Sequence, residues 1–207
     1  MFVSSIIVDE WIKMRSESVY LRSWLEASIC PMVRAHSRAP MWPQVHHFIP
    51  KLDLKSPDSH LPPRIVADAR RFVKVTRFHK INKFRVYASA RDDCCVVLVE
   101  FTPKCVARFE RYHRLRITAE TTNTIFLIGR VSLKYVPIAQ ARQSWHVNSP
   151  SVTDLHVLPV LVVDECVAFD LDQVIPHRAF PYLYEQDKFL DCMKDDGKKY
   201  AKKDTSV

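Results

Sequence analysis

The sequence predicts an all-β core with helices: a five-stranded Greek-key barrel with a helix between its third and fourth strands and helical embellishments at both ends. Two observations support this prediction. Several segments of strand length between residues 72 and 136, and again from residue 157, are either alternately or continuously apolar. Between the third and fourth of these segments stands Thr102-Pro103, a hydroxyl cap followed by proline, which is a typical helix start.

The first 64 residues are expected to pack on the barrel rather than to form a second domain. Apolar side chains recur near helical spacing at Val19, Leu21, Trp24, Leu25 and Ile29. Residues 38–63 are rich in proline and predict a covering loop. The barrel domain is expected to span residues 65–186, and the charged segment 187–207 is expected to be a mobile tail.

Three strands are expected before the helix, at residues 72–78, 84–92 and 95–101. The second alternates, which predicts four inward side chains (Phe84, Val86, Ala88, Ala90) and four outward ones (Arg85, Tyr87, Ser89, Arg91). The third is continuously apolar, so we expect it to be covered on both faces. Residues 91–93, Arg-Asp-Asp, predict the turn between them.

The helix is expected to run from Thr102 to about His113 and is followed by a strand at 124–136 and a last strand or strand pair at 157–172. Gly129 inside the fourth strand suggests a bulge or bend. Three strands, a helix and two strands is the order of an OB-fold barrel. We expect its core to contain Val73, Val86, Ala88, Leu98, Val99, Phe109, Leu127 and Val131.

The composition excludes several classes of function. Gly129 and Gly197 are the only glycines, so no glycine-rich phosphate loop can be written. The six cysteines form no C-x-x-C pair, and we expect neither a metal nor a cofactor. Asp170 and Asp172 alternate as in a metal-dependent nuclease but lack a third acidic ligand, so no enzyme is expected. No segment has the length of a membrane span.

Two features point to a binding function. Between residues 70 and 134 there are 15 Lys and Arg against 5 Asp and Glu, which can attract nucleic acid or an acidic partner, or can be a solvated face. The second is the polar loop, residues 118–123 (TAETTN), which enters a buried strand without glycine or proline. Glu120, Thr121 and Asn123 can read a partner's backbone and a basic side chain, or Thr121 and Asn123 can cap their own loop.

Several segments together resemble the family of small OB-fold regulatory subunits of yeast telomerase, the third "ever shorter telomeres" proteins. They are SVYLRSW (18–24), FRVYASARD (84–92), LVEF (98–101), FERYHRLRITAETTN (109–123), FDLDQV (169–174) and FPYLY (180–184). The resemblance covers residues 72–136 and 157–184 and the short N-terminal piece. It implies an OB-fold similar to the telomerase-recruiting domain of mammalian shelterin.

The resemblance also implies a non-catalytic telomerase subunit required for telomere maintenance. Its expected partners are the telomerase reverse transcriptase and accessory subunits, with the telomerase RNA contacted indirectly and weak or no binding to single-stranded telomeric DNA. The expected location is the nucleus, at chromosome telomeres. The alternative is an OB-fold protein that binds single-stranded telomeric DNA or RNA directly.

Family positions imply roles for individual residues. Trp24, Glu110, Glu120, Thr121 and Asn123 fall on the family's interaction surface. By their residue type alone, Trp24 can instead dock the N-terminal helix, and Glu110 can be a charge partner of nearby arginines.

The family also has a basic and an acidic residue at the positions of Arg77 and Asp92, which implies a structural ion pair. For the nucleic-acid alternative, a stacking platform would be built from Tyr87, Arg85 and Arg91, with Phe78 beside them. A flanking segment that covered these outward side chains would remove that platform.

Overall fold

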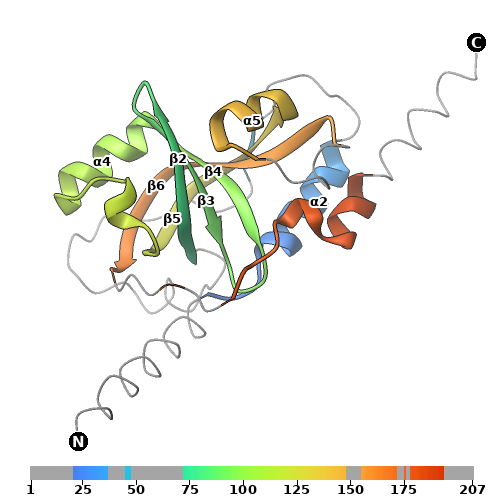
Figure 1. The fold of residues 1–207 in the computed structure, drawn as a ribbon, viewed down its shortest axis with the longest axis horizontal. Helices are drawn as coiled ribbons and strands as arrows, with labels where there is room; N and C mark the ends of the chain where they lie inside the picture. The colour runs from blue at the N-terminus through green and yellow to red at the C-terminus, as the bar shows by residue number, and fades with distance from the viewer. Residues whose placement is uncertain are drawn as a thin grey trace, which may run out of the picture.

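The barrel is formed by five strands: β2 (Phe72–Asn82), β3 (Arg85–Arg91), β4 (Val96–Phe101), β5 (Ile125–Pro137) and β6 (Val157–Asp170). The structure is a computed structural model and describes residues 21–36, 45–47 (backbone only), 72–147, 155–171, 175 and 178–193. The strand order β2-β3-β4-β6-β5 closes because β5 pairs with both β6 and β2, and every pair is antiparallel except β4–β6 (Figure 1). This topology confirms the predicted OB-fold. A short strand, β1 (Val45–His47), adds to β5.

The helix between the third and fourth barrel strands is α4 (Pro103–His113), and its predicted start is confirmed. The Thr102 hydroxyl accepts a hydrogen bond from the Cys105 amide, and Pro103 occupies the first turn. The helix ends at Arg114, whose φ of 58° is left-handed and whose N–H donates to the Glu110 carbonyl. Phe109 is buried against the barrel, whereas Tyr112 is 57% exposed.

The predicted core is formed by one large cluster and one small one. All the predicted core residues except Leu127 lie in the large cluster. Leu127 packs instead in a smaller cluster with Leu21, Phe72 and Ile125. Phe72 is the first residue of β2, so this cluster lies where the first barrel strand begins. Phe84, predicted to point inward, is 78% exposed, because it falls in the β2–β3 turn rather than in a strand.

The outer face of β3 and β4 is covered by α5 (Ile138–Trp145), which the sequence did not predict. The buried Trp145 indole donates to the carbonyls of Ala88 and Val99, each at 3.1 Å, and so ties this helix to β3 and β4. Tyr87, Ser89 and Arg91, predicted to point outward, are therefore buried, but under different segments: Tyr87 packs against Trp145, Ser89 lies near Tyr182, and Arg91 lies over Phe180.

Residues 178–193 also pack on the barrel. The Tyr184 hydroxyl in η4 (Leu183–Glu185) donates to the Pro159 carbonyl at 2.7 Å and accepts from the Leu98 amide. Residues 187–193 are helical, with Phe189 and Cys192 buried, so the start of the expected tail is part of the fold. Residues 194–207 lie outside the described residues.

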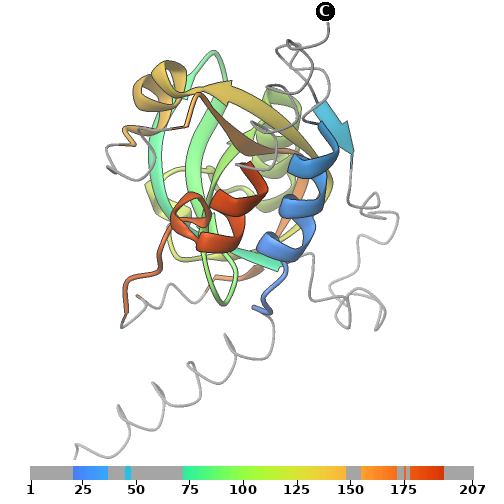
Figure 2. The same ribbon diagram turned by 90° about the vertical axis from the view of Figure 1, so that its right-hand side faces the viewer.

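The helix α2 (Leu25–His36) lies beside this C-terminal helical segment against one side of the barrel (Figure 2). Trp24, just before the helix, and Leu25, Ile29 and Val33 within it belong to the large core cluster, so the packing expected for the N-terminal part is observed for these residues. Val19 and most of the proline-rich segment 38–63 lie outside the described residues.

A buried carboxylate, Asp92, fixes the start of α2. One carboxylate oxygen accepts from the amides of Trp24 (2.8 Å) and Leu25 (2.9 Å). The other accepts from the amides of Cys94 (2.8 Å) and Cys95 (3.0 Å) in the β3–β4 turn. Asp92 therefore caps a helix and a hairpin turn with one side chain, and its negative charge faces the positive end of the helix dipole.

The predicted ion pair of Arg77 and Asp92 is not formed. Arg77 is exposed and stands opposite Ser89 on β3, whereas Asp92 directly follows that strand, three residues after Ser89, and is 1% exposed. The carboxylate is instead saturated by four backbone N–H groups. The structural role expected for Asp92 holds with different partners.

Replacing Asp92 by alanine is expected to lower the free energy of unfolding by at least about 2 kcal/mol, since several buried N–H groups lose their acceptor. Chemical denaturation of the full chain measures this loss. Asp93→Ala is the matched control, because the neighbouring aspartate is exposed, and it should change stability by less than about 0.5 kcal/mol. Equal stability of the two variants would contradict the role given to Asp92.

Candidate protein-interaction surface

The polar loop leaves the end of α4 and is shaped by its own backbone hydrogen bonds. It contains one turn of 3-10 helix, η2 (Ala119–Thr121). The Thr121 amide donates to the Thr118 carbonyl at 3.0 Å, and the Thr122 amide donates to the Ala119 carbonyl at 3.2 Å. These bonds give the loop a defined shape, with Glu120 exposed on it.

Thr121 faces into the loop. Its side chain is buried, and its hydroxyl lies 3.2 Å from the Arg116 carbonyl and 3.1 Å from the Thr118 carbonyl, to which it donates. Both carbonyls also accept a backbone N–H, from Thr118 and Thr121, so the hydroxyl adds a side-chain hydrogen bond that closes the loop on itself. The geometry therefore matches the alternative in which Thr121 caps its own loop, and a direct contact with a partner needs other side chains.

Asn123 anchors the loop to the barrel. Its amide donates to the Val75 carbonyl at 2.7 Å, and the Val75 amide donates to the Thr124 carbonyl at 3.1 Å. Asn123 has a φ of 63°, a left-handed conformation that asparagine tolerates better than most residues. The left-handed backbone therefore explains why asparagine occupies this position. The half-buried Asn123 side chain remains a candidate for partner contact.

Glu110 lies half-buried on the flank of α4, the helix that leads into the polar loop. No ion pair joins it to Arg108, Arg111 or Arg114 among the described residues. Arg108 instead donates to the buried Glu165 on β6 at 2.8 Å. The local charge pairing considered for Glu110 is therefore not its role in this structure, and its carboxylate remains a candidate for the same surface as Glu120.

Trp24 is buried, as is required if it docks the N-terminal helix on the barrel. Its ring is 2% exposed, and its indole N–H donates to the Phe72 carbonyl at 3.0 Å. A buried ring of this size contributes to stability through packing. An effect of Trp24 on partner binding would have to act through the position of α2 and of the start of β2.

The stacking platform suggested for single-stranded nucleic acid is closed. Tyr87 is 7% exposed and packs edge-on against Trp145, with ring centroids 4.7 Å apart. Arg91 is 2% exposed, lies 4.1 Å from the Phe180 ring centroid and donates to the Asp92 carbonyl. Neither side chain is available to a base or a phosphate.

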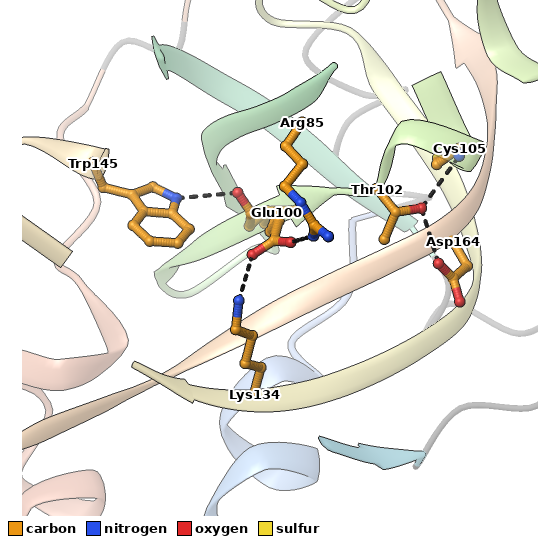
Figure 3. A network of polar contacts seen from close by, with 8 residues as sticks. Arg85, Glu100, Thr102, Cys105, Lys134, Trp145 and Asp164 are labelled. Atoms are coloured by element: carbon orange, nitrogen blue, oxygen red, sulfur yellow. Dashed lines mark hydrogen bonds and ion pairs between the residues drawn. The ribbon is translucent and has the colours of Figure 1, made fainter. Parts of the chain in front are cut away.

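The third platform residue, Arg85, belongs to a charge network around Glu100 (Figure 3). Glu100 is 1% exposed and accepts from Arg85 on β3 and from Lys134 on β5, the latter at 3.0 Å. Burial raises the pKa of the neighbouring Tyr87 hydroxyl, and the Glu100 charge raises it further. Arg85 thus neutralises a buried carboxylate instead of standing free for a phosphate.

Other expectations concern metals and membranes. Within the described ranges, no three His, Cys, Asp or Glu side chains are grouped so that they could hold a metal ion. No helix in the described part of the chain is long and apolar enough to cross a membrane. Asp170 ends β6, and its suggested companion Asp172 lies outside the described residues.

A half-buried histidine that the sequence did not single out lies on β2. A ring nitrogen of His79 is 2.8 Å from the Ser89 hydroxyl, which is 3.4 Å from the Tyr182 hydroxyl. Partial burial, together with the charges of Arg77 and His146, lowers the pKa of His79 to about 4. His79 is therefore neutral at physiological pH and is part of the packing between β2, β3 and the C-terminal segment.

Comparison with known proteins gives consistent matches over most of the chain. Residues 21–185 match the family described as "Shelterin complex subunit, TPP1/ACD". The telomere replication protein EST3 of Eremothecium gossypii is 36% identical over 179 residues, covering 86% of this chain and 88% of that protein. EST3 of Kluyveromyces lactis is 30% identical over 173 residues, covering 82% and 91%.

A solved structure has the same fold. It is described as "Est3 telomerase subunit in the yeast Hansenula polymorpha", with a TM-score of 0.59, 17% identity, and coverage of 85% of this chain and 86% of that chain.

Stability is expected to fall as the pH is lowered from about 6.5 to about 4. In this window the unfolded chain protonates His79 at its ordinary pKa of 6.5, whereas the folded protein keeps the ring neutral down to about 4. The contribution is therefore fully present above pH 6.5. Thermal melts over this range test it against His79→Gln, which cannot titrate and should show a flatter dependence. Identical pH dependence of both proteins would contradict it.

Proposed function

Because the chain belongs to the family of the shelterin complex subunit TPP1/ACD, we propose that it is a non-catalytic subunit of telomerase that acts in telomere maintenance. The names of its relatives, telomere replication protein EST3 and Est3 telomerase subunit, support this assignment. Its place of action is the nucleus, at chromosome telomeres.

The proposed activity is protein binding. The chain binds the telomerase reverse transcriptase and accessory subunits, and it meets the telomerase RNA only through them. The covered outer face of β3 and β4 supports this choice over direct nucleic-acid binding, since Trp145 packs on Tyr87 where a base would stack. Binding to single-stranded telomeric DNA is expected to be weak at physiological salt.

The interface is proposed to be the polar loop together with the Glu110 flank of α4. The observation that carries this proposal is the anchoring of the loop: Asn123 is bonded to Val75 on β2, and the Thr121 hydroxyl is bonded inside the loop. A loop held in this way presents the exposed Glu120 at low entropic cost on binding. Its carboxylate suits a basic side chain or backbone N–H groups of the partner.

Variants of the loop test the proposal. Glu120→Ala and Glu110→Ala should leave stability within about 0.5 kcal/mol of the parent. They should weaken association with purified telomerase about five- to hundred-fold, as expected when a partner group is left unpaired. Asn123→Ala should also weaken association. Thr121→Ala should lower the melting temperature as well, because the loop loses the buried hydroxyl that bonds to its own carbonyls.

The matched control is Asp187→Ala, which removes an exposed carboxylate on the C-terminal helical segment, away from the loop. Each variant is melted and titrated against the same purified telomerase. If the variants at Glu110 and Glu120 bind like the control, the loop is not the interface. If the parent chain itself does not bind, the assignment to telomerase fails.

A further inference from the structure

The β2–β3 hairpin ends in an exposed apolar tip that neither the polar loop nor the buried platform includes. We define the hairpin tip as residues 80–85. It projects from the barrel at the end where α4 lies (Figure 1). Phe84 is 78% exposed and Ile81 is 58% exposed, and Phe84 is the most exposed large hydrophobic residue in the described part of the chain.

The backbone of the tip is unfavourable for the residues that occupy it. Asn82 pairs with Arg85, so Lys83 and Phe84 form a two-residue turn. Their φ values are 48° and 62°, which is the left-handed region. Hairpin turns of this kind favour asparagine and glycine, because a side chain with a Cβ crowds the backbone there. A phenylalanine in this position costs stability, and its exposed ring regains little through packing.

The charges around the tip are all of one sign. No Asp or Glu occurs between residues 72 and 91. Arg77, Lys80 and Lys83 are exposed, while Arg85 is engaged by Glu100. An exposed aromatic ring and an exposed aliphatic side chain are thus surrounded by cations that no carboxylate on the same hairpin neutralises.

We propose that the hairpin tip is a second docking site for a protein subunit of telomerase, in which Phe84 and Ile81 enter an apolar pocket rimmed by acidic side chains. A central aromatic anchor with a charged rim is the usual anatomy of a binding hot spot. Complementary charge at the rim speeds association and selects the partner. This proposal rests on the proposed function, in which the chain is a subunit of telomerase.

A protein fits the tip better than a single-stranded nucleic acid. Sequence-tolerant binding of single strands uses successive aromatic rings along a basic groove. The aromatic side chain that follows on β3, Tyr87, is buried under Trp145, and Ile81 has no flat face for a base. A single exposed ring at the turn, with an exposed aliphatic side chain three residues before it, is instead suited to insertion in a pocket.

Phe84→Gly tests the proposal, and Lys83→Gly is its matched control. Both substitutions place glycine at a positive φ in the same turn, and only the first removes the ring. Both proteins should therefore melt at or above the temperature of the parent. Only Phe84→Gly should weaken binding to purified telomerase by about tenfold or more, the loss typical of an anchor residue. Lys80→Glu should weaken binding to telomerase more at low salt than at high salt.

The readouts separate the possible failures. If the parent chain does not bind telomerase, the proposed function fails first. If the parent binds and the variants at Phe84 and Lys83 bind equally well, the docking site is overturned. A labelled single-stranded telomeric oligonucleotide is titrated in parallel, and a loss confined to this probe in Phe84→Gly would reassign the tip to nucleic acid and overturn the proposal.

Discussion

The attachment of the N-terminal helix depends on the buried carboxylate of Asp92. It accepts four backbone N–H groups: two at the start of α2, from residues 68 and 67 positions away in sequence, and two in the adjoining β3–β4 turn. With α2 fixed in this way, Trp24 is buried and bonded to Phe72 at the first residue of β2. The polar loop is anchored to Val75 on the same strand, so one end of the barrel is organised by successive contacts that begin at Asp92.

The second constraint is the cover on the outer face of the barrel. Trp145 from α5 and Tyr184 from the C-terminal segment each bond to backbone groups of the strands beneath them, so the cover is held by directed hydrogen bonds as well as by apolar packing. An OB-fold that binds single strands leaves aromatic and basic side chains open on this kind of surface. Here Tyr87 is buried and Arg85 neutralises Glu100, which is why recognition is proposed to use the polar loop and the hairpin tip instead.

Local patterns were sufficient for the barrel and for α4. Alternation predicted the strands, and Thr102-Pro103 predicted the helix start, because both signals lie within a few residues of the structure they specify. The α5 helix was missed because it is only eight residues long, so its apolar spacing, Ile138, Ala141 and Trp145, covers too few turns to stand out. The partners of Asp92 were also missed, because two of them belong to residues 67 and 68 positions away in sequence. The inward Thr121 hydroxyl matches one of the two alternatives that the sequence left open. The polar loop, by contrast, was identified from its composition, and its partner contact remains a prediction.

Hydrogen exchange of the full chain, free and bound to purified telomerase, tests most directly whether the chain docks through the polar loop and the hairpin tip. We predict slower exchange on binding at the amides of residues 118–124 in the polar loop and 80–85 in the hairpin tip. Exchange in α5, residues 138–145, should not change, because that helix serves as internal cover. Protection confined to α5, with none in the polar loop or the hairpin tip, would contradict this account.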